Sequence, residues 1–168
     1  MDRDKRRPPR RLWLAGAAGL ALLVTGCATA TNELNPGPEV LKAAAKPSLG
    51  RVLADDSGRT VYMFAKDEAD QSYCQGACAS VWVPVTTKGM PMAEDGLKPG
   101  KVTLIKRADG LMQVVYNGHP LYYYQADTGT SDTYGQEQNQ FGAEWYALTP
   151  AGNQAETSKQ KGGGSYGS

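Results

Sequence analysis

The residues best suited to chemistry in this chain are three cysteines and a single histidine. Cys74 and Cys78 stand four residues apart, a spacing that places two thiolates on one face of a helix, where they suit Cu(I). His119 is the distant imidazole that such a site would use. In an oxidising compartment the same cysteine pair forms a disulfide by default. The pair therefore predicts either a structural disulfide or a copper or redox site.

The amino terminus indicates export. Six basic residues lie among the first eleven, and an uncharged apolar run follows at residues 12–24. This order is typical of a secretory signal, and the run is shorter than the roughly 20 apolar residues of a membrane-spanning helix. Val24-Thr25-Gly26-Cys27 then resembles a bacterial lipobox, in which small residues admit the peptidase and the cysteine thiol accepts diacylglycerol. We expect a signal peptide at residues 1–26 and a lipid on Cys27.

Cleavage before Cys27 removes six basic and two acidic residues, which changes the formal net charge from +1 to −3. A mildly acidic mature chain argues against nucleic-acid binding, which needs a basic surface. We expect the lipid on Cys27 to attach the chain to the membrane, outside the cytoplasm, where Cys74 and Cys78 favour a disulfide. The alternative is an uncleaved anchor or an ordinary cleaved signal with Cys27 incidental. Arg10-Arg11 leaves the twin-arginine export route open.

Composition divides the mature chain into a tether, one domain and a tail. Residues 27–47 contain three prolines and many small residues, so we expect a lipid anchor followed by a flexible tether. Residues 48–151 suffice for one domain with its own core, which we expect to be a monomer. Residues 152–168 are polar and end in a glycine-rich stretch, and we expect them to be disordered.

Apolar alternation and turn signals predict a mainly β domain. Residues 51–64 and 101–124 consist of apolar-rich runs joined by short polar turns. Asn117-Gly118 between two such runs is a strong hairpin signal, because both turn residues need a positive φ. The only candidate helix is short and lies at about residues 72–82, near Cys74 and Cys78.

The domain contains two copies of one pattern. Residues 56–67 align with residues 116–127 at a constant offset of 60. The shared motif, Tyr-x-(Phe/Tyr)-x-x-Asp, comprises Tyr62, Phe64, Asp67, Tyr122, Tyr124 and Asp127. We expect repeat 1 at about residues 48–88 and repeat 2 at about 101–150, each with a hairpin, a loop and a strand that opens with tryptophan. Packed about a pseudo-two-fold axis, they would form one sandwich-like or partly closed barrel domain. Each aspartate falls just past a strand, where a carboxylate accepts backbone N–H groups.

These features together resemble the secreted-repeat lipoproteins of bacteria, a family recognised by a Tyr-x-(Phe/Trp/Tyr)-x-x-Asp motif. The resemblance covers roughly residues 48–150 and includes the lipobox. It also includes the stretches 74–84, 107–110, 113–122 and 132–136. The family has no settled activity, so the resemblance implies an exported, repeat-containing class of protein and no particular reaction.

A catalytic set is missing from the sequence. His119 lies in a turn before Pro120, and neither a Gly-x-Ser-x-Gly motif nor a phosphate loop is present. We expect a non-enzymatic envelope module without a cofactor, which binds an unidentified envelope partner or small ligand. Two alternatives stay open. One is a copper-handling or redox lipoprotein that uses Cys74 and Cys78, and the other is an envelope hydrolase that uses Asp67 and Asp127 as acid and base.

Overall fold

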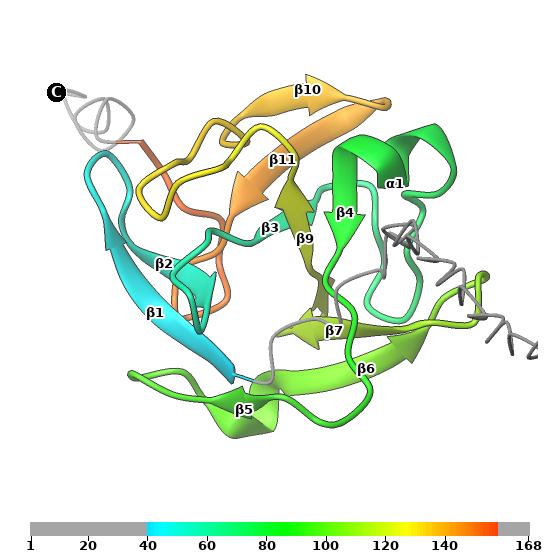
Figure 1. The fold of residues 1–168 in the computed structure, drawn as a ribbon, viewed down its shortest axis with the longest axis horizontal. Helices are drawn as coiled ribbons and strands as arrows, with labels where there is room; N and C mark the ends of the chain where they lie inside the picture. Colours follow the sequence, from blue (N-terminus) through cyan, green and yellow to red (C-terminus); the bar gives the residue numbers. More distant parts are fainter. Residues whose placement is uncertain (1–39, 158–168) are drawn as a thin grey trace, which may run out of the picture. The chain divides into compact units, whose positions relative to one another are not determined.

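The computed structural model describes residues 40–157 (Figure 1). This part of the chain contains eleven strands, one short α-helix and one turn of 3-10 helix. The strands are β1 Val40–Lys46, β2 Gly50–Asp55, β3 Tyr62–Phe64, β4 Trp82–Pro84, β5 Met92–Ala93, β6 Val102–Lys106, β7 Met112–Tyr116, β8 His119–Pro120, β9 Tyr122–Tyr124, β10 Gln138–Gln140 and β11 Ala143–Ala147. Helix α1 spans Ala77–Val81, and the 3-10 turn η1 spans Pro99–Lys101. The prediction of a mainly β domain with a short helix near the cysteine pair is confirmed.

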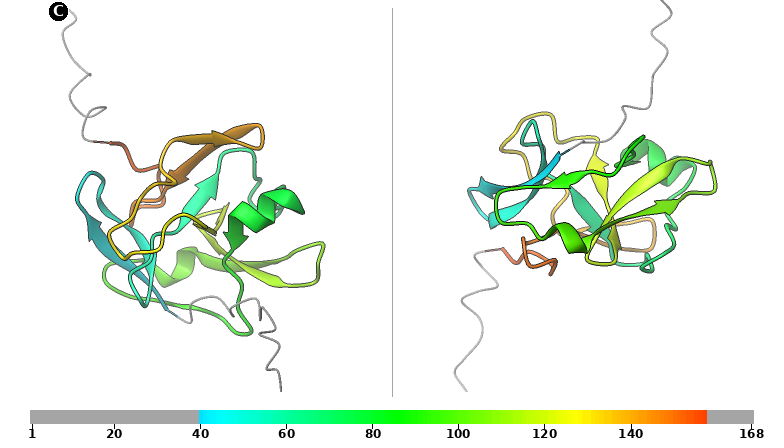
Figure 2. Two further views of the ribbon diagram at one scale, coloured as in Figure 1. Left: turned by 45° about the horizontal axis from the view of Figure 1, so that its top comes forward. Right: turned by 90° about the horizontal axis from the view of Figure 1, so that it is seen from below.

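The strands form three sheets. β1 pairs antiparallel with β2 and parallel with β5, while β6, β7 and β8 form the second small sheet. The hairpins β1–β2 and β6–β7 are the equivalent parts of the two repeats. The third sheet, in the order β10–β11–β3–β9–β4, curls between these hairpins (Figures 1 and 2). This architecture is the partly closed barrel that the repeated pattern predicted.

The central sheet interlaces the two repeats. β3 of repeat 1 pairs antiparallel with β11 of repeat 2, and β9 of repeat 2 pairs antiparallel with β4 of repeat 1. β3 and β9 meet at the centre, where Tyr62 lies opposite Tyr122. The strands that open with Trp82 and Trp145 therefore each complete the other repeat. The repeated pattern assigns each tryptophan strand to the same repeat as its hairpin, but it does not show that this strand pairs with the other repeat.

The turn between β7 and β8 has the predicted conformation. Asn117 and Gly118 both have positive φ, at 51° and 82°. Tyr116 and His119 pair across the turn, which is the arrangement of a two-residue hairpin loop. The turn directs the chain from β7 back toward β9 and so places the second copy of the motif beside the first.

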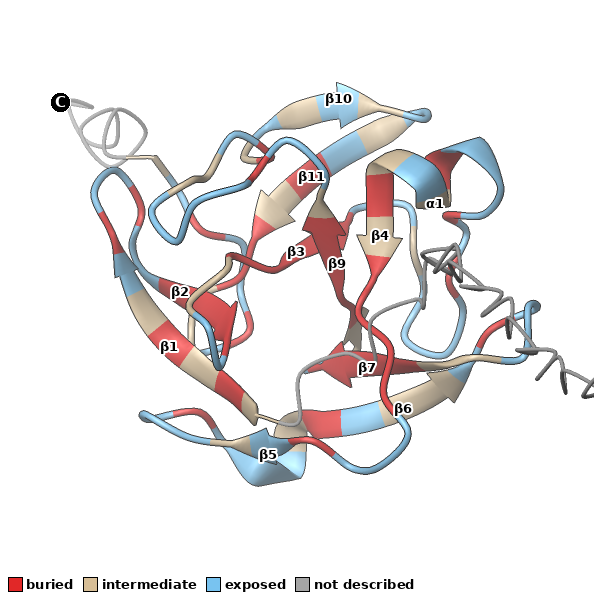
Figure 3. Ribbon diagram, in the orientation of Figure 1, coloured by how far each residue is buried: buried red, intermediate tan, exposed pale blue. Residues whose placement is uncertain are grey.

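The buried side chains of the described residues form two clusters. Figure 3 marks buried residues in red, and β3 and β9 are red along most of their length. The first cluster combines aliphatic residues of both hairpins with residues that adjoin the strands of the central sheet: Leu41, Leu53, Val61, Val85, Val102, Val114, Leu121 and Leu148. The second follows the central sheet and contains aromatic rings and both cysteines of the pair: Tyr62, Phe64, Trp82, Tyr122, Trp145, Cys74 and Cys78. Burial of one such large apolar side chain contributes about 1.5–3 kcal/mol to stability.

Two predicted boundaries are wrong. Val40–Lys46, which was assigned to the flexible tether, forms β1 and pairs along its length with β2. Ala155, which was assigned to the disordered tail, is buried, and its N–H donates to the carbonyl of Ala147. In both places small or polar residues are ordered by the backbone of a neighbouring strand, a contact that composition does not reveal. The predicted signal peptide, Cys27 and the remainder of the tether and tail lie outside the described residues.

Candidate functional site

The polar residues of the repeated motif form two crossed pairs. The hydroxyl of Tyr62 donates a hydrogen bond of 2.5 Å to Oδ2 of Asp127. The hydroxyl of Tyr122 donates a hydrogen bond of 2.5 Å to Oδ2 of Asp67. Both tyrosines are fully buried at the centre of the sheet. Each tyrosine therefore binds the aspartate of the other repeat, and the two copies of the motif work as one unit.

Each aspartate also orders the loop that follows it. Oδ1 of Asp67 accepts the backbone N–H of Tyr73 at 2.7 Å. Oδ1 of Asp127 accepts the backbone N–H of Tyr134 at 2.9 Å. This is the role expected of a carboxylate just past a strand. Both oxygens of each carboxylate are thus engaged by the protein itself, one by a side chain and one by the backbone.

A buried arginine supports one of the crossed pairs. Arg107 is only 6% exposed. Its Nη1 donates to Oγ of Ser72 at 2.7 Å, and this Oγ lies 2.7 Å from the hydroxyl of Tyr122. Its Nη2 donates to the carbonyl of Cys74 at 2.9 Å, and its Nε donates to Asp109 at 3.0 Å. A buried charge is stable only when it is paired and hydrogen-bonded, and this guanidinium meets both conditions.

Lys46 lies near the other crossed pair. Its side chain is buried at the end of β1, and Nζ donates to the carbonyls of Gly58, at 2.8 Å, and Thr130. Burial lowers the pKa of Lys46, while the charges of three nearby aspartates, Asp127 first, act in the opposite direction. Lys46 thus joins the loop of repeat 2 to the hairpin of repeat 1, as Arg107 joins the loop of repeat 1 to the hairpin of repeat 2.

Burial dominates the electrostatics of both aspartates. Loss of solvent raises the pKa of Asp67 to about 6, although its hydrogen bonds and the charge of Arg107 act to lower it. Loss of solvent also raises the pKa of Asp127. The charge of Asp132 also raises the pKa of Asp127, and the charge of Arg59 lowers it. Each motif carboxyl is thus perturbed mainly by its own burial.

A column of four stacked rings crosses the centre of the domain. The rings of Trp82 and Trp145 lie 3.9 Å apart with their planes at 5°. Phe64 stacks on Trp145 at 4.1 Å, and Tyr124 stacks on Trp82 at 4.3 Å. The side-chain oxygen of Gln140 accepts the indole N–H of Trp82, and its carbonyl accepts that of Trp145. Aromatic pairs contribute about 0.5–1.5 kcal/mol beyond the area they bury, so this column adds to the attachment of one repeat to the other.

Cys74 and Cys78 are joined by a disulfide, as predicted. Cys78 lies in α1, whereas Cys74 precedes the helix, so the helical spacing considered for a copper site is absent. Both residues are buried, and Sγ of Cys74 lies 3.9 Å from the carbonyl of Trp82. His119 is half-buried in β8, and burial lowers its pKa. Within residues 40–157, no three His, Cys, Asp or Glu side chains are grouped as a metal site requires.

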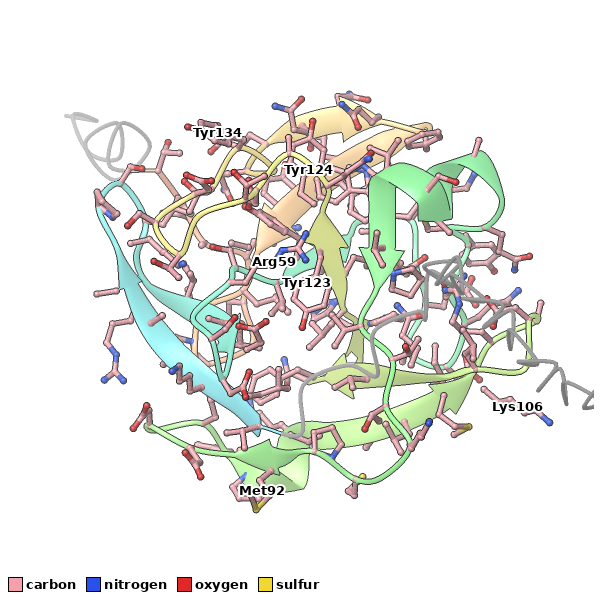
Figure 4. All side chains as sticks on the ribbon, in the orientation of Figure 1. Arg59, Met92, Lys106, Tyr123, Tyr124 and Tyr134 are labelled. Atoms are coloured by element: carbon pink, nitrogen blue, oxygen red, sulfur yellow. A yellow bond between two sulfur atoms is a disulfide. The ribbon has the colours of Figure 1, made fainter. Side chains whose placement is uncertain are left out.

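Arg59, which aligns with His119 in the other repeat, makes a further cross-repeat contact. Its guanidinium lies over the ring of Tyr123, 4.4 Å from the ring centroid. Its Nη2 donates to the carbonyl of Tyr124 at 3.1 Å, and Figure 4 shows the three residues together at the centre of the domain. A cation over an aromatic ring contributes about 0.5–2 kcal/mol. The turn before β3 is thereby attached to β9.

Sequence reasoning missed three residues that support the crossed pairs: Lys46, Arg107 and Gly135. A Cβ atom on Gly135 would lie 2.8 Å from Cζ of Tyr62 and 2.9 Å from Cη2 of Trp82, so only glycine fits there without a shift. Lys46 and Arg107 stand at nearly the repeat offset, which is the one signal that could have indicated a shared role.

A polar hollow of about 280 Å³ opens beside one crossed pair. It is lined by Asp70, Gln71, Ser72, Gln75, Lys106, Arg107 and Ala108. Most of the donors of Arg107 are directed at protein acceptors, so the guanidinium forms part of the wall. The wall of this hollow is therefore polar and partly charged.

Comparison with known protein families agrees with the repeated structure. A family model described as a secreted repeat of unknown function matches the chain twice, at residues 43–86 and 103–149. The two matches together cover more than half of the chain. The chain belongs to this secreted-repeat family. No curated protein and no solved structure matches it.

Each match to the secreted-repeat family follows one structural repeat. The first begins in β1 and ends just after β4, and the second begins in β6 and ends just after β11. The family unit thus contains a hairpin, a motif strand and a tryptophan strand. In this secreted-repeat protein the motif strand pairs with the tryptophan strand of the other unit. No helix in residues 40–157 is long and apolar enough to cross a membrane.

Proposed function

We propose that this secreted-repeat protein is a non-enzymatic module of the cell envelope, held to the membrane by a lipid on Cys27. One observation supports the non-enzymatic part: all four oxygens of Asp67 and Asp127 accept hydrogen bonds from the protein. A catalytic carboxyl must direct an oxygen at its substrate, and here that would break the contacts that join the two repeats. The domain would act by presenting its surface to an envelope partner or a small ligand.

The lipid anchor is supported by the order of the first 27 residues. A basic segment, a short apolar run and the sequence Val24-Thr25-Gly26-Cys27 follow one another as in a lipoprotein signal. The disulfide adds support, because Cys74 and Cys78 are already paired and Cys27 is the remaining cysteine. A free cysteine at the start of an exported chain is the expected acceptor for diacylglycerol.

The anchor is tested by cell fractionation of the full chain. The wild-type protein should sediment with the membranes, and mass spectrometry of its mature form should show a diacylglycerol-modified Cys27 at the amino terminus. Cys27→Ser should abolish both the cleavage before residue 27 and the lipid mass. The double variant Cys74→Ser, Cys78→Ser is the matched control and should keep both. An unmodified Cys27 in the mature wild-type protein contradicts the proposal.

The non-enzymatic part is tested with chromogenic ester, glycoside and peptide substrates. The purified protein should give no turnover above that of buffer. Turnover that disappears in Asp67→Asn but persists in the exposed neighbour control Asp70→Asn would contradict a purely binding role. Each variant is compared by circular dichroism, so that a loss of folding is not mistaken for a loss of catalysis.

A further inference from the structure

An exposed apolar edge lies at one end of the domain. Met90 is 62% exposed and Met92 is 58% exposed, high values for large apolar side chains. They border an open hollow of about 490 Å³ that is also lined by Pro91, Ala93, Glu94 and Pro99. Figure 4 shows Met92 pointing away from the rest of the domain. We name the side chains of Met90 and Met92, with the hollow beside them, the methionine edge.

The methionine edge lies where the chain enters the domain. β5 pairs in parallel with β1, and Met92 is the partner of Val40, the first described residue. The neighbouring pair joins Leu41 to Ala93, and the N–H of Glu94 donates to the carbonyl of Leu41 at 2.9 Å. The backbone that arrives from Cys27 is therefore fixed to the same strand that carries Met92.

The chain between the lipid site and this edge is short. Twelve residues, 28–39, separate Cys27 from Val40. Twelve residues span at most about 40 Å when fully extended and about 20 Å on average as a random chain. A domain of this size is itself about 30–35 Å across, so the linker holds the entry edge within a distance of the membrane comparable with the width of the domain. A short linker also keeps this edge close to the bilayer, so the effective concentration of the edge at the lipid surface is high.

The charges around the methionine edge include both signs and do not oppose contact with a lipid surface. Lys88 precedes Met90 and is exposed, and Lys98 is exposed beside Pro99. Glu94 and Asp95 are the acidic residues nearby, and the backbone carbonyl of Asp95 accepts a hydrogen bond from Arg51. Lysine stems reach along apolar surface while the ammonium groups stay among the headgroups. Two methionines alone bind a bilayer weakly, so the contact depends on the lipid anchor to bring it there.

From this placement we infer that the methionine edge is a membrane-contact surface. Met90 and Met92 enter the interface of the bilayer to which the chain is anchored, and this contact orients the domain. The inference rests on the proposed lipid at Cys27. The orientation turns β10, at the opposite end of the domain, away from the membrane and leaves it open to a partner (Figures 1 and 2).

The test uses the full, anchored chain with a single introduced thiol. Lys88→Cys is labelled with an environment-sensitive fluorophore, because it keeps both methionines and Cys74 and Cys78 are already bonded. Asn139→Cys, exposed in β10, carries the control label. Both proteins are placed in vesicles of phosphatidylethanolamine and phosphatidylglycerol, and emission and quenching by lipid-borne nitroxides are measured.

We expect a blue-shifted, lipid-quenched signal at position 88 and a water-like signal at position 139. Met90→Ser with Met92→Ser should return the signal at position 88 to that of position 139 while the chain stays in the membrane fraction. Equal, water-like signals at both positions in anchored protein overturn the inference and leave the lipid anchor intact. A shift that needs high protein density and resists the lipid-borne quencher overturns it too, and assigns the edge to a second copy of the chain. Failure of the chain to associate with vesicles at all overturns the anchor as well.

Discussion

The hydroxyl of Tyr62 donates a 2.5 Å hydrogen bond to the carboxylate of Asp127, a residue 65 positions away in the other copy of the repeat. The hydroxyl of Tyr122 donates the equivalent hydrogen bond to Asp67, so each tyrosine binds the aspartate of the other repeat. Each motif strand also pairs with the tryptophan strand of the other copy. The pattern within each repeat therefore specifies contacts between the repeats, and the domain folds as one interlaced unit.

Neither repeat should fold alone. A fragment of residues 40–93 contains β3 and β4 but lacks β11 and β9, their partners in the central sheet. The fragment exposes the face of Trp82 that stacks on Trp145, and it lacks Tyr122, the hydrogen-bond donor to Asp67. We expect this fragment and residues 94–157 each to give the narrow amide spectrum of an unfolded chain, and their equimolar mixture to regain the dispersed spectrum. A dispersed spectrum from one fragment that runs as a monomer contradicts this expectation.

Stability should fall as the pH rises from about 4 to 7. Burial raises the pKa of Asp67 to about 6, above its value of 3.8 in the unfolded chain, so the folded state binds more protons within this window. The stabilisation is complete below the unfolded pKa and is lost as the pH rises through the folded one. Two pKa units correspond to about 3 kcal/mol, and partial exposure of the carboxyl reduces the expected effect to about 2 kcal/mol.

The measurement is urea unfolding at pH 4 and pH 7 for the wild type, Asp67→Asn and Asp70→Asn. Asp67→Asn should lose much of the pH dependence, and the exposed control Asp70→Asn should keep it. The raised pKa of Asp127 acts in the same direction, so a residual slope in Asp67→Asn is expected. An unchanged slope in Asp67→Asn would show that this carboxyl is not the group that titrates.

Gly135→Ala should destabilise the domain by about 1–3 kcal/mol, the usual cost of overpacking a core. The added methyl group meets the rings of Tyr62 and Trp82, which are both fully buried and cannot move aside freely. Gly89→Ala is the matched control, because its Cβ meets open space and the residue has no positive φ. Equal urea midpoints for the two variants would contradict this prediction. They would mean that the rings of Tyr62 and Trp82 accommodate the methyl group without loss of stability.

Removal of the disulfide should weaken the fold without abolishing it. The cross-link closes a short loop, for which the chain-entropy model gives a stabilisation of about 2 kcal/mol. Cys74→Ser with Cys78→Ser should therefore lower the urea midpoint and keep the amide dispersion, because the corresponding loop of repeat 2 contains no cysteine. A free-thiol count and metal analysis of the wild type test the copper alternative directly. Reduced Cys74 and Cys78 with stoichiometric copper would contradict a structural disulfide.

The sequence predicted the local features well, because they depend on neighbouring residues. Asn117-Gly118 needs only its own two φ angles, the disulfide needs a spacing and a compartment, and each aspartate caps the loop beside it. Two repeats were visible as an offset of 60 residues. These inferences require no knowledge of which distant strands come together.

The pairing of each motif strand with the tryptophan strand of the other repeat was not predictable from the sequence. Alternation in β3 shows which side chains share a face but does not show whether β4 or β11 lies beside it. The sequence does not predict β1, because its alanines give little apolar alternation, although Leu41 and Ala43 are buried. The burial of Arg107 was equally hidden, because a lone arginine in a turn gives no sign of the acceptors that surround it in the fold.

A double-mutant cycle on the crossed pairs tests the interlaced fold most directly. Tyr62→Phe should cost about 1.5–3 kcal/mol, the usual contribution of a hydrogen bond to a charged group. Tyr62→Phe and Asp127→Asn should be non-additive by at least about 1 kcal/mol in urea unfolding, whereas Tyr62→Phe and Asp67→Asn should add within about 0.5 kcal/mol. Coupling of Tyr62 to Asp67 instead, within one repeat, would contradict the hydrogen bonds between the repeats.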